Sequence, residues 1–380
     1  RTALSDLTGV STGVIQNYES RRNDLYYESA EMFAKALQID VELLLDEYTR
    51  FSQANVGDVI TRPVFIRTLD EVKKDKQSKP YVRFTLLDSE SEATAIMFDT
   101  DESKLSAKGI ARHIIANAKI KVGNYNGKSF NVESIEPYKD NDLRFEDFII
   151  TPPMDVNVMY EEITAMLRSA ADDMGGSVTP LSELAVSILE ENKSKYLHSS
   201  AAVAVHHNFL GGLVYHSYRM FKAADALCGV YDELDRELLL CAAAIHDIGK
   251  IWEYSTDMYG DAEYTRSGVL FGHIYLGANL VNKQADKLKA EKGAKFNDEK
   301  LMLLAHMILS HHGTLEWGAV VPPAIPEAFA LHYIDNLDAK LNVCDKEYKK
   351  LSSGEVTQSK PFTFDGRIYK PRYKDPSAKS

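Results

Sequence analysis

The chain has 380 residues, of which 44% are hydrophobic and 26% are charged, and its formal net charge is −12. Since domains average roughly 150 residues, this length indicates two or three domains, and the composition excludes a wholly disordered chain. The three cysteines show no C-x-x-C spacing, which argues against a disulfide scaffold and a cysteine-based zinc finger. No apolar run reaches about 18 residues and no secretory leader is evident, so we expect a cytoplasmic protein without a membrane partner.

The negative charge is unevenly distributed along the chain. Residues 1–51 carry a net charge of −4, residues 52–140 a net charge of +1, and residues 141–380 a net charge of −9. The middle segment is therefore where we expect a polyanion to bind.

The hydrophobic pattern divides the chain into parts with different periodicity. Residues 1–51 have apolar residues at helical spacing, whereas residues 52–140 contain five or six short β-rich runs separated by turn residues. A proline-containing linker at residues 141–157 leads to a helical domain at residues 158–351 and a polar tail at residues 352–380. We therefore predict a multidomain chain with an all-α helix-turn-helix segment, a small β-barrel and an all-α domain.

The N-terminal segment has the spacing of a helix-turn-helix. A short helix ends at Gly9, and Ser11 is placed to cap a second helix. The segment resembles the Cro-type (XRE) helix-turn-helix family, with the family's first helix truncated. The resemblance implies contacts to duplex DNA through Thr12, Gln16, Asn17, Arg21 and Arg22. Because the segment is acidic, a docking or oligomerisation module that does not bind DNA is the alternative.

Basic and aromatic residues alternate in the β-rich middle of the chain. Single strands are bound where aromatic side chains stack on bases and cations pair with phosphates. The residues that we expect to contact nucleic acid in this way are Lys74, Lys76, Lys79, Tyr81, Arg83 and Tyr125. The arrangement resembles an OB-fold of the kind appended to nucleases. Phe84 and Phe98, in contrast, are expected to fill the core of the barrel.

An adjacent imidazole and carboxylate, His246 and Asp247, end an apolar helical run and are followed by Gly249. Burying such a pair is costly unless the two groups are paired or bind a metal. Imidazole and carboxylate ligands suit Mn²⁺, Fe²⁺, Zn²⁺ or Co²⁺, so the ligands do not decide the metal. A carboxylate such as that of Asp247 can bridge two metals about 3.5–4 Å apart, which is the spacing used in phosphate-ester hydrolysis.

The wider pattern resembles the HD-domain metal-dependent phosphohydrolases, whose signature is H…HD…D. His216, His246-Asp247 and Asp335 match this signature, and His273 with His311-His312 resembles its two-metal branch. The stretches around these residues, among them residues 306–313 and 332–339, are similar to the YhaM-type 3′→5′ exoribonucleases. That family joins an OB-fold to an HD domain in this order, and the likeness covers about residues 52–370.

The resemblance implies two divalent metal ions, for which Mn²⁺ is the expected species. The implied ligands of the first ion are His216, His246, Asp247 and Asp335, and those of the second are His273 and one or both of His311 and His312, with Asp247 bridging. Asp247 and Lys250 are the expected catalytic residues, with Lys250 meeting a phosphate oxygen. Asp338 is expected to lie next to the ligands, and His306 to be a structural helix histidine.

The implied activity is that of a metal-dependent 3′→5′ exonuclease. It would hydrolyse single-stranded RNA, or also single-stranded DNA, to nucleoside 5′-monophosphates through a metal-activated water, and we expect a homo-oligomer. Two alternatives stay open, because a fold and its ligands do not fix the substrate. One is an HD-type nucleotide or cyclic-dinucleotide phosphohydrolase, and the other is a DNA-binding regulator with a ligand-sensing HD domain.

Overall fold

The chain forms two compact units in the computed structural model. The barrel unit comprises residues 1–150, 348–360 and 369–380, and the helical unit comprises residues 151–347 and 361–368. The residues that the structure describes are 2–8, 10, 12, 15, 32–33, 35–37, 50–52, 54–72, 80–88, 91–125, 128–140, 143–171, 178–203, 208–351, 353–361 and 364–374.

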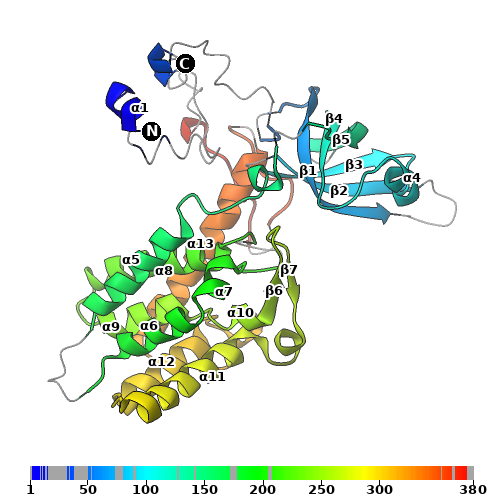
Figure 1. The fold of residues 1–380 in the computed structure, drawn as a ribbon. Coiled ribbons are helices and arrows are strands. Elements are labelled where there is room, and N and C mark those ends of the chain that lie inside the picture. Colours follow the sequence, from blue (N-terminus) through cyan, green and yellow to red (C-terminus); the bar gives the residue numbers. More distant parts are fainter. Residues whose placement is uncertain are drawn as a thin grey trace. The chain divides into compact units, whose positions relative to one another are not determined.

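Five strands close into a barrel in the first unit (Figure 1). They are β1 (Val59–Val72), β2 (Tyr81–Leu87), β3 (Glu92–Phe98), β4 (Ile115–Asn124) and β5 (Lys128–Pro137). The strand order is β1-β2-β3-β5-β4, with β4 returning to β1, and the β3–β5 pair is the parallel one. The helix α4 (Glu102–Ala107) connects β3 to β4. The prediction of a small OB-like barrel is thus confirmed.

Alternation along β2 contributes buried side chains to the barrel core. Val82, Phe84 and Leu86 of β2 are buried, while the residues between them face outward or lie at the rim. The same period places Phe98 with the outward residues of β3, and its side chain is 61% exposed. The prediction that Phe98 fills the core was therefore wrong, because it weighed aromatic character above register.

Two further differences concern element boundaries in the barrel. Two of the short β-rich runs expected from the sequence, at residues 59–60 and 64–66, belong to the single 14-residue strand β1. This strand pairs with β4 through its first half and with β2 through its second. The helix α4 was not predicted. It begins at a capping residue, Asp101, whose carboxylate accepts the backbone N–H of Lys104 at 2.8 Å.

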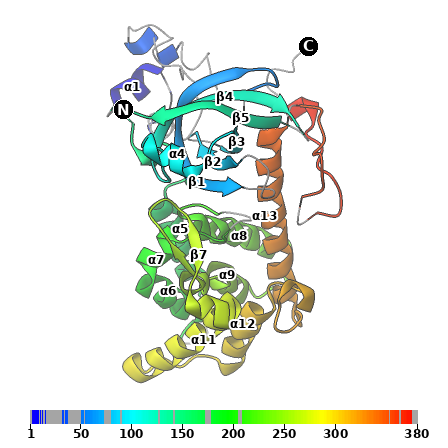
Figure 2. The ribbon, with the colours of Figure 1, turned by 90° about the vertical axis from the view of Figure 1, so that its right-hand side faces the viewer.

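The helical unit is built around a buried central helix. Its helices are α5 (Val156–Ser169), α6 (Leu181–Glu191), α7 (Lys193–His198), α8 (Gly212–Cys228), α9 (Arg236–Ile245), α10 (Lys250–Glu253), α11 (Arg266–Lys292), α12 (Asp298–Ser310) and α13 (Pro326–Lys350). The helix α9 is buried from Glu237 to its end and contacts α5, α6, α8 and α12 (Figure 2). This explains why its sequence is apolar on every side rather than on one stripe.

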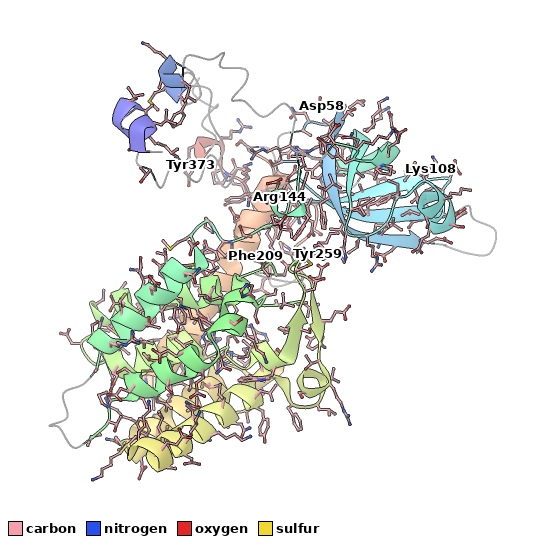
Figure 3. The ribbon with its side chains drawn as sticks, in the orientation of Figure 1. Asp58, Lys108, Arg144, Phe209, Tyr259 and Tyr373 are labelled. Atoms are coloured by element: carbon pink, nitrogen blue, oxygen red, sulfur yellow. The ribbon has the colours of Figure 1, made fainter. Side chains whose placement is uncertain are left out.

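A short hairpin interrupts the helices of this unit. It consists of β6 (Tyr254–Thr256) and β7 (Ala262–Tyr264), which the sequence pattern did not predict. Figure 3 shows Tyr259 in the hairpin loop at the same end of the unit as Phe209, which lies in the segment before α8, and the backbones of Gly260 and Leu210 approach each other there. Within the described part of the chain, no helix combines the length and the apolarity that crossing a bilayer requires.

Only part of the predicted helix-turn-helix is described. The helix α1 (Thr2–Thr8) is present, Thr12 is exposed and Ile15 is buried. Four of the five predicted DNA-contacting residues, Gln16, Asn17, Arg21 and Arg22, lie outside the described residues. The helix-turn-helix therefore stays a prediction.

Candidate metal centre and nucleic-acid surface

All seven predicted ligand residues come together in the helical unit. They are His216 on α8, His246 and Asp247 at the end of α9, His273 on α11, His311 and His312 after α12, and Asp335 on α13. Their ligand atoms form overlapping groups in which all atoms lie within 4.8 Å of one another: His216 with His246 and Asp335, His246 with Asp247 and His311, and His273 with His311 and His312.

The carboxylate of Asp247 lies between two sets of imidazoles. Its Oδ2 atom is 3.6 Å from Nε2 of His216 and 3.3 Å from Nε2 of His246. Its Oδ1 atom is 3.5 Å from Nε2 of His273 and 3.6 Å from Nε2 of His311. Each oxygen thus faces a different set, which is the arrangement that a carboxylate needs to bridge two metal ions.

Close backbone packing brings α11 to the turn that carries Asp247. Gly249 lies in that turn, and a Cβ atom there would sit 2.0 Å from the carbonyl oxygen of His273. No other residue type fits without moving α11, so the glycine after the His-Asp pair is what allows His273 to reach Asp247.

A kink in α11 aims His273 at the centre. Gly272 has φ 68° and ψ 158°, a conformation that is essentially restricted to glycine. After this kink, the backbone N–H of His273 donates to Oε1 of Glu253 at 3.2 Å, and its Nδ1 lies 2.8 Å from Oε2 of the same carboxylate. Because a carboxylate only accepts, Nδ1 is the nitrogen that donates to Glu253, and Nε2 faces Asp247.

A second carboxylate orients His216 in the same way. The Nδ1 atom of His216 lies 2.8 Å from Oδ2 of Asp338, one helical turn beyond Asp335 on α13. Arg219, one turn along α8, forms an ion pair with the other oxygen of Asp338. The Nε2 atom of His216 is then left to face Asp335 at 3.3 Å.

Backbone carbonyls orient the remaining imidazoles. The Nδ1 atoms of His246, His311 and His312 lie 3.2, 2.7 and 2.8 Å from the carbonyl oxygens of Ala243, Ile308 and Trp317, respectively. These contacts fix Nδ1 as the donor and turn Nε2 inward. His306, by contrast, accepts the backbone N–H of Ala324 through Nε2 at 3.1 Å, as expected for a structural histidine.

The inward-facing atoms are buried without hydrogen bonds. Within the described ranges, Nε2 of His246, His273 and His311 and Oδ1 of Asp247 have no hydrogen-bond partner. Leaving one such buried polar atom unpaired costs about 1–3 kcal/mol, so four at one point need a common partner. Neutral imidazole nitrogens with carboxylate oxygens are a donor set for divalent transition metals, and the residues therefore fit two such ions.

The charge states of the centre match this donor set. Burial raises the pKa of Asp335, but the neighbouring imidazoles, led by His216, outweigh it and hold that pKa well below its usual range. Burial together with the imidazoles of His311 and His273 lowers the pKa of His312 to about 3. Burial also disfavours charge on His216, but Asp335 and Asp338 outweigh it and raise the pKa of His216 to about 9. A cation next to the two carboxylates is thus favoured, whether a proton or a metal ion.

Lys250 contacts the carboxylate of Asp247 directly. Its Nζ atom lies 2.6 Å from Oδ2 of Asp247, and its side chain is almost fully buried at the start of α10. The sequence placed Lys250 near the reacting phosphate but did not predict this ion pair. The contacts of Glu253 with His273 and of Arg219 with Asp338 could not be predicted from the sequence, because the partners are distant along the chain.

The predicted nucleic-acid contacts lie partly on the outer surface of the barrel. Tyr81 and Phe98 are paired across β2 and β3, with ring centroids 5.9 Å apart, and Arg83 is exposed next to them on β2. Tyr125, in the β4–β5 turn, is 80% exposed. The remaining predicted contacts, Lys74, Lys76 and Lys79, lie outside the described residues.

Comparisons with known proteins show what the chain is similar to. Residues 213–340, which include all seven predicted ligands, match the family model described as HD domain. The 3′-5′ exoribonuclease YhaM of Geobacillus sp. (strain WCH70) is 34% identical over 299 residues, covering 77% of this chain and 86% of the relative. The 3′-5′ exoribonuclease YhaM of Bacillus subtilis (strain 168) is 31% identical over 298 residues, covering 78% of this chain and 90% of the relative.

Proposed function

Because the chain belongs to the YhaM family of 3′-5′ exoribonucleases, we propose that it is a metal-dependent exonuclease that shortens single-stranded RNA from the 3′ end. The observation that carries this proposal is the position of Asp247, whose two oxygens face two separate sets of imidazoles. The released product is a nucleoside 5′-monophosphate.

We assign the ligands in two groups. His216, His246, Asp247 and Asp335 hold the first divalent ion. His273, His311, His312 and Asp247 hold the second. The HD family implies divalent metal binding, and we propose Mn²⁺, which imidazole and carboxylate ligands accept readily. When bound, two such ions supply Lewis acidity at the phosphate oxygens and acidify the attacking water.

The protein's own side chains orient the ligating imidazoles and neutralise charge on the phosphate. Asp338 and Glu253 hold His216 and His273 in the tautomer that leaves Nε2 free to ligate. Lys250 lies 2.6 Å from the bridging carboxylate, where a small shift of its flexible stem brings Nζ to a phosphate oxygen. There the ammonium stabilises the negative charge that builds as the ester bond breaks.

The barrel unit binds the single-stranded RNA in this proposal. Tyr81, Phe98 and Tyr125 offer aromatic faces, and Arg83 offers a cation, on the outer side of β2 and β3 and in the β4–β5 turn. These are the positions through which OB-folds bind oligonucleotides. Duplex DNA binding through the N-terminal segment, homo-oligomerisation and a cytoplasmic location remain predictions from the sequence.

A labelled-strand assay tests the proposal. A 5′-labelled single-stranded RNA and its DNA counterpart are incubated with Mn²⁺ or with EDTA, with wild type and with Asp247→Ala. We expect a ladder that shortens from the 3′ end with Mn²⁺, no cleavage in EDTA, and none with the variant. Asp286→Ala, which removes an exposed carboxylate on the same helical unit, is the control and should cleave like wild type.

The outcomes separate the alternatives. If metal-loaded wild type degrades neither strand but hydrolyses nucleotides or cyclic dinucleotides, the small-substrate phosphohydrolase is correct. If it hydrolyses none of these, the alternative of a DNA-binding regulator with a ligand-sensing HD domain is favoured. Comparable ladders on RNA and DNA would show that the 2′-hydroxyl is not read.

A further inference from the structure

Two large aromatic side chains next to the metal centre are exposed to solvent. Trp317 is 59% exposed and Phe271 is 56% exposed. Aromatic side chains of this size normally contribute their area to a core, and exposed ones that border a polar site indicate a binding surface. Neither side chain has a role in the metal ligation described above.

Each of the two is tied to a residue of the second ligand group. The carbonyl oxygen of Trp317 accepts the hydrogen bond from Nδ1 of His312 at 2.8 Å. Phe271 precedes Gly272, the kink of α11, and the next residue is His273. The rings of His273 and His312 are neighbours, with centroids 5.2 Å apart and an interplanar angle of 55°. The two aromatic residues therefore border the same ligand group from α11 and from the loop after α12.

The rings are also held in place from one side. Phe271 packs against Tyr275, one turn along α11, with centroids 5.5 Å apart and an interplanar angle of 33°. Trp317 packs against His332 of α13 with centroids 6.0 Å apart. A ring that is supported on one side and open on the other is a platform for a flat partner.

The chemistry of the metal centre indicates that this flat partner is a nucleobase. If a phosphodiester lies at the two metal ions, the groups next to it are the ribose and base of the terminal nucleotides. Every base has a π-face, so aromatic stacking grips a strand without reading its sequence. An exonuclease that removes successive nucleotides needs such a sequence-tolerant grip at the scissile end.

We propose that Trp317 and Phe271 form a base-stacking subsite that holds the 3′-terminal nucleotides of a single strand at the metal centre. The proposal rests on the function proposed above, and it makes the helical unit a second strand-binding surface in addition to the barrel. The residues act by binding substrate, so their loss should raise KM more than it lowers kcat.

The tryptophan content of the chain allows a direct binding test. The chain has two tryptophans, Trp252 and Trp317, so Trp252→Phe leaves the proposed platform as the single tryptophan. In EDTA, where no hydrolysis occurs, a five-nucleotide RNA should quench the fluorescence of this variant. An otherwise identical strand with abasic 3′-terminal nucleotides should not. In Trp317→Phe, which retains Trp252, the RNA should leave the fluorescence unchanged.

A kinetic test uses the chain with its metal ions. Trp317→Ala and Phe271→Ala should each raise KM for RNA about tenfold, since base–aromatic stacking has roughly this effect per base. With the abasic-ended strand, both variants should match wild type. Trp317→Phe should restore most of the affinity. Tyr231→Ala, which removes an exposed aromatic residue between α8 and α9, is the matched control and should leave KM unchanged.

The two proposals fail in different ways. If Trp317→Ala and Phe271→Ala degrade RNA with the wild-type KM, or if the abasic-ended strand quenches as strongly as the RNA, the stacking subsite is wrong and the exonuclease stands. If wild type degrades no RNA, the exonuclease is wrong. The fluorescence measurement in EDTA still decides whether bases stack on Trp317.

Discussion

Both carboxylate oxygens of Glu253 bind a single residue, His273: Oε2 lies 2.8 Å from its Nδ1, and Oε1 accepts its backbone N–H at 3.2 Å. Burial raises the pKa of Glu253, but these hydrogen bonds outweigh it and hold the pKa below its usual value, so the group is charged at neutral pH. A charged acceptor behind a ligating imidazole makes the imidazole a stronger ligand and fixes its orientation.

We therefore expect Glu253→Ala to weaken the second metal ion selectively. Loss of a hydrogen-bonded partner of this kind typically costs about 10–100-fold in metal affinity. Isothermal titration with Mn²⁺ should show one site with the wild-type affinity and one that is weakened by this factor. Glu253→Gln retains an acceptor oxygen, so the affinity of its weakened site for Mn²⁺ should lie between those of wild type and Glu253→Ala.

Glu263→Ala is the matched control, because Glu263 is exposed on β7 and contributes to neither ligand group. It should bind two ions as wild type does. Two unchanged sites in Glu253→Ala would show that His273 does not need its carboxylate partner.

Metal removal should destabilise the helical unit. The buried atoms that lack hydrogen bonds, among them Nε2 of His246 and Oδ1 of Asp247, gain their partners only when cations bind. An ion at 100 times its Kd adds about 2.7 kcal/mol, which for a unit of roughly 200 residues raises Tm by about 5–10 °C. Scanning calorimetry with Mn²⁺ and with EDTA measures the difference. Asp247→Asn should show little Tm response to Mn²⁺, and an equal response would argue against the bridging role.

The convergence of the seven predicted ligand residues could be predicted from the sequence because it follows from a recognisable signature. The helix α9 is apolar on all sides, so its end, with His246 and Asp247, had to be buried, and a buried pair of this kind needs compensation. The geometry that supports these ligands could not be predicted. Glu253 reaches His273 only because α11 kinks at Gly272, and no spacing in the sequence reveals a kink.

The barrel shows a similar limit. Its existence followed from the short β-rich runs, but the strand ends depended on tertiary pairing: β1 extends through both predicted runs because β4 and β2 pair with its two halves. Phe98 lies on the outward face of β3 with Thr94 and Ile96, so its hydrophobicity alone does not indicate where its side chain lies. The period-two rule, applied to β3 alone, would have placed it correctly.

The two adjacent histidines after α12 should differ in their effect on the fold. His311 is fully buried beside Asp247 and His246, whereas His312 is only partly buried and holds the carbonyl oxygen of Trp317. We expect His312→Ala to lose the second ion and to retain the Tm of the metal-free protein. His311→Ala should lose the second ion, weaken the first, and lower that Tm by several degrees, because it leaves a cavity in the centre.

Metal analysis after gel filtration, combined with calorimetry in EDTA, separates the two variants. His306→Ala serves as the control, since His306 contacts the backbone of Ala324 and no ligand, and it should retain both ions. Two ions bound in His312→Ala would assign His312 to an orienting role.

Tyr125 should contribute to RNA affinity without contributing to stability. Its ring is 80% exposed, so its removal costs the fold little, whereas stacking on a base is worth about 1–3 kcal/mol. We expect Tyr125→Ala to weaken binding of a labelled ten-nucleotide RNA in EDTA by about 5–150-fold, measured by fluorescence anisotropy, with an unchanged Tm. Tyr373→Ala removes an equally exposed tyrosine of the same unit, and the proposal fails for Tyr125 if the two variants bind alike.

Lys250 should act on the chemical step more than on metal binding. Its ammonium lies 2.6 Å from Oδ2 of Asp247. If a divalent ion compensated the charge of that carboxylate, Lys250 would be able to neutralise a phosphate oxygen in the transition state. Removal of one such charge-stabilising donor typically lowers kcat by about 10²–10³-fold. Lys250→Met should therefore lose this much kcat at saturating Mn²⁺ while KM changes little.

Titration of Mn²⁺ into the same variant decides between the two roles of Lys250. If the lysine mainly compensates the charge of Asp247, its loss leaves a buried carboxylate with one cation fewer, and Mn²⁺ should bind more tightly than in wild type. A variant that binds Mn²⁺ more tightly and also retains kcat would limit Lys250 to holding the metal-free carboxylate. Lys283→Met, a change at an exposed lysine on α11, controls for the loss of one positive charge from the same unit.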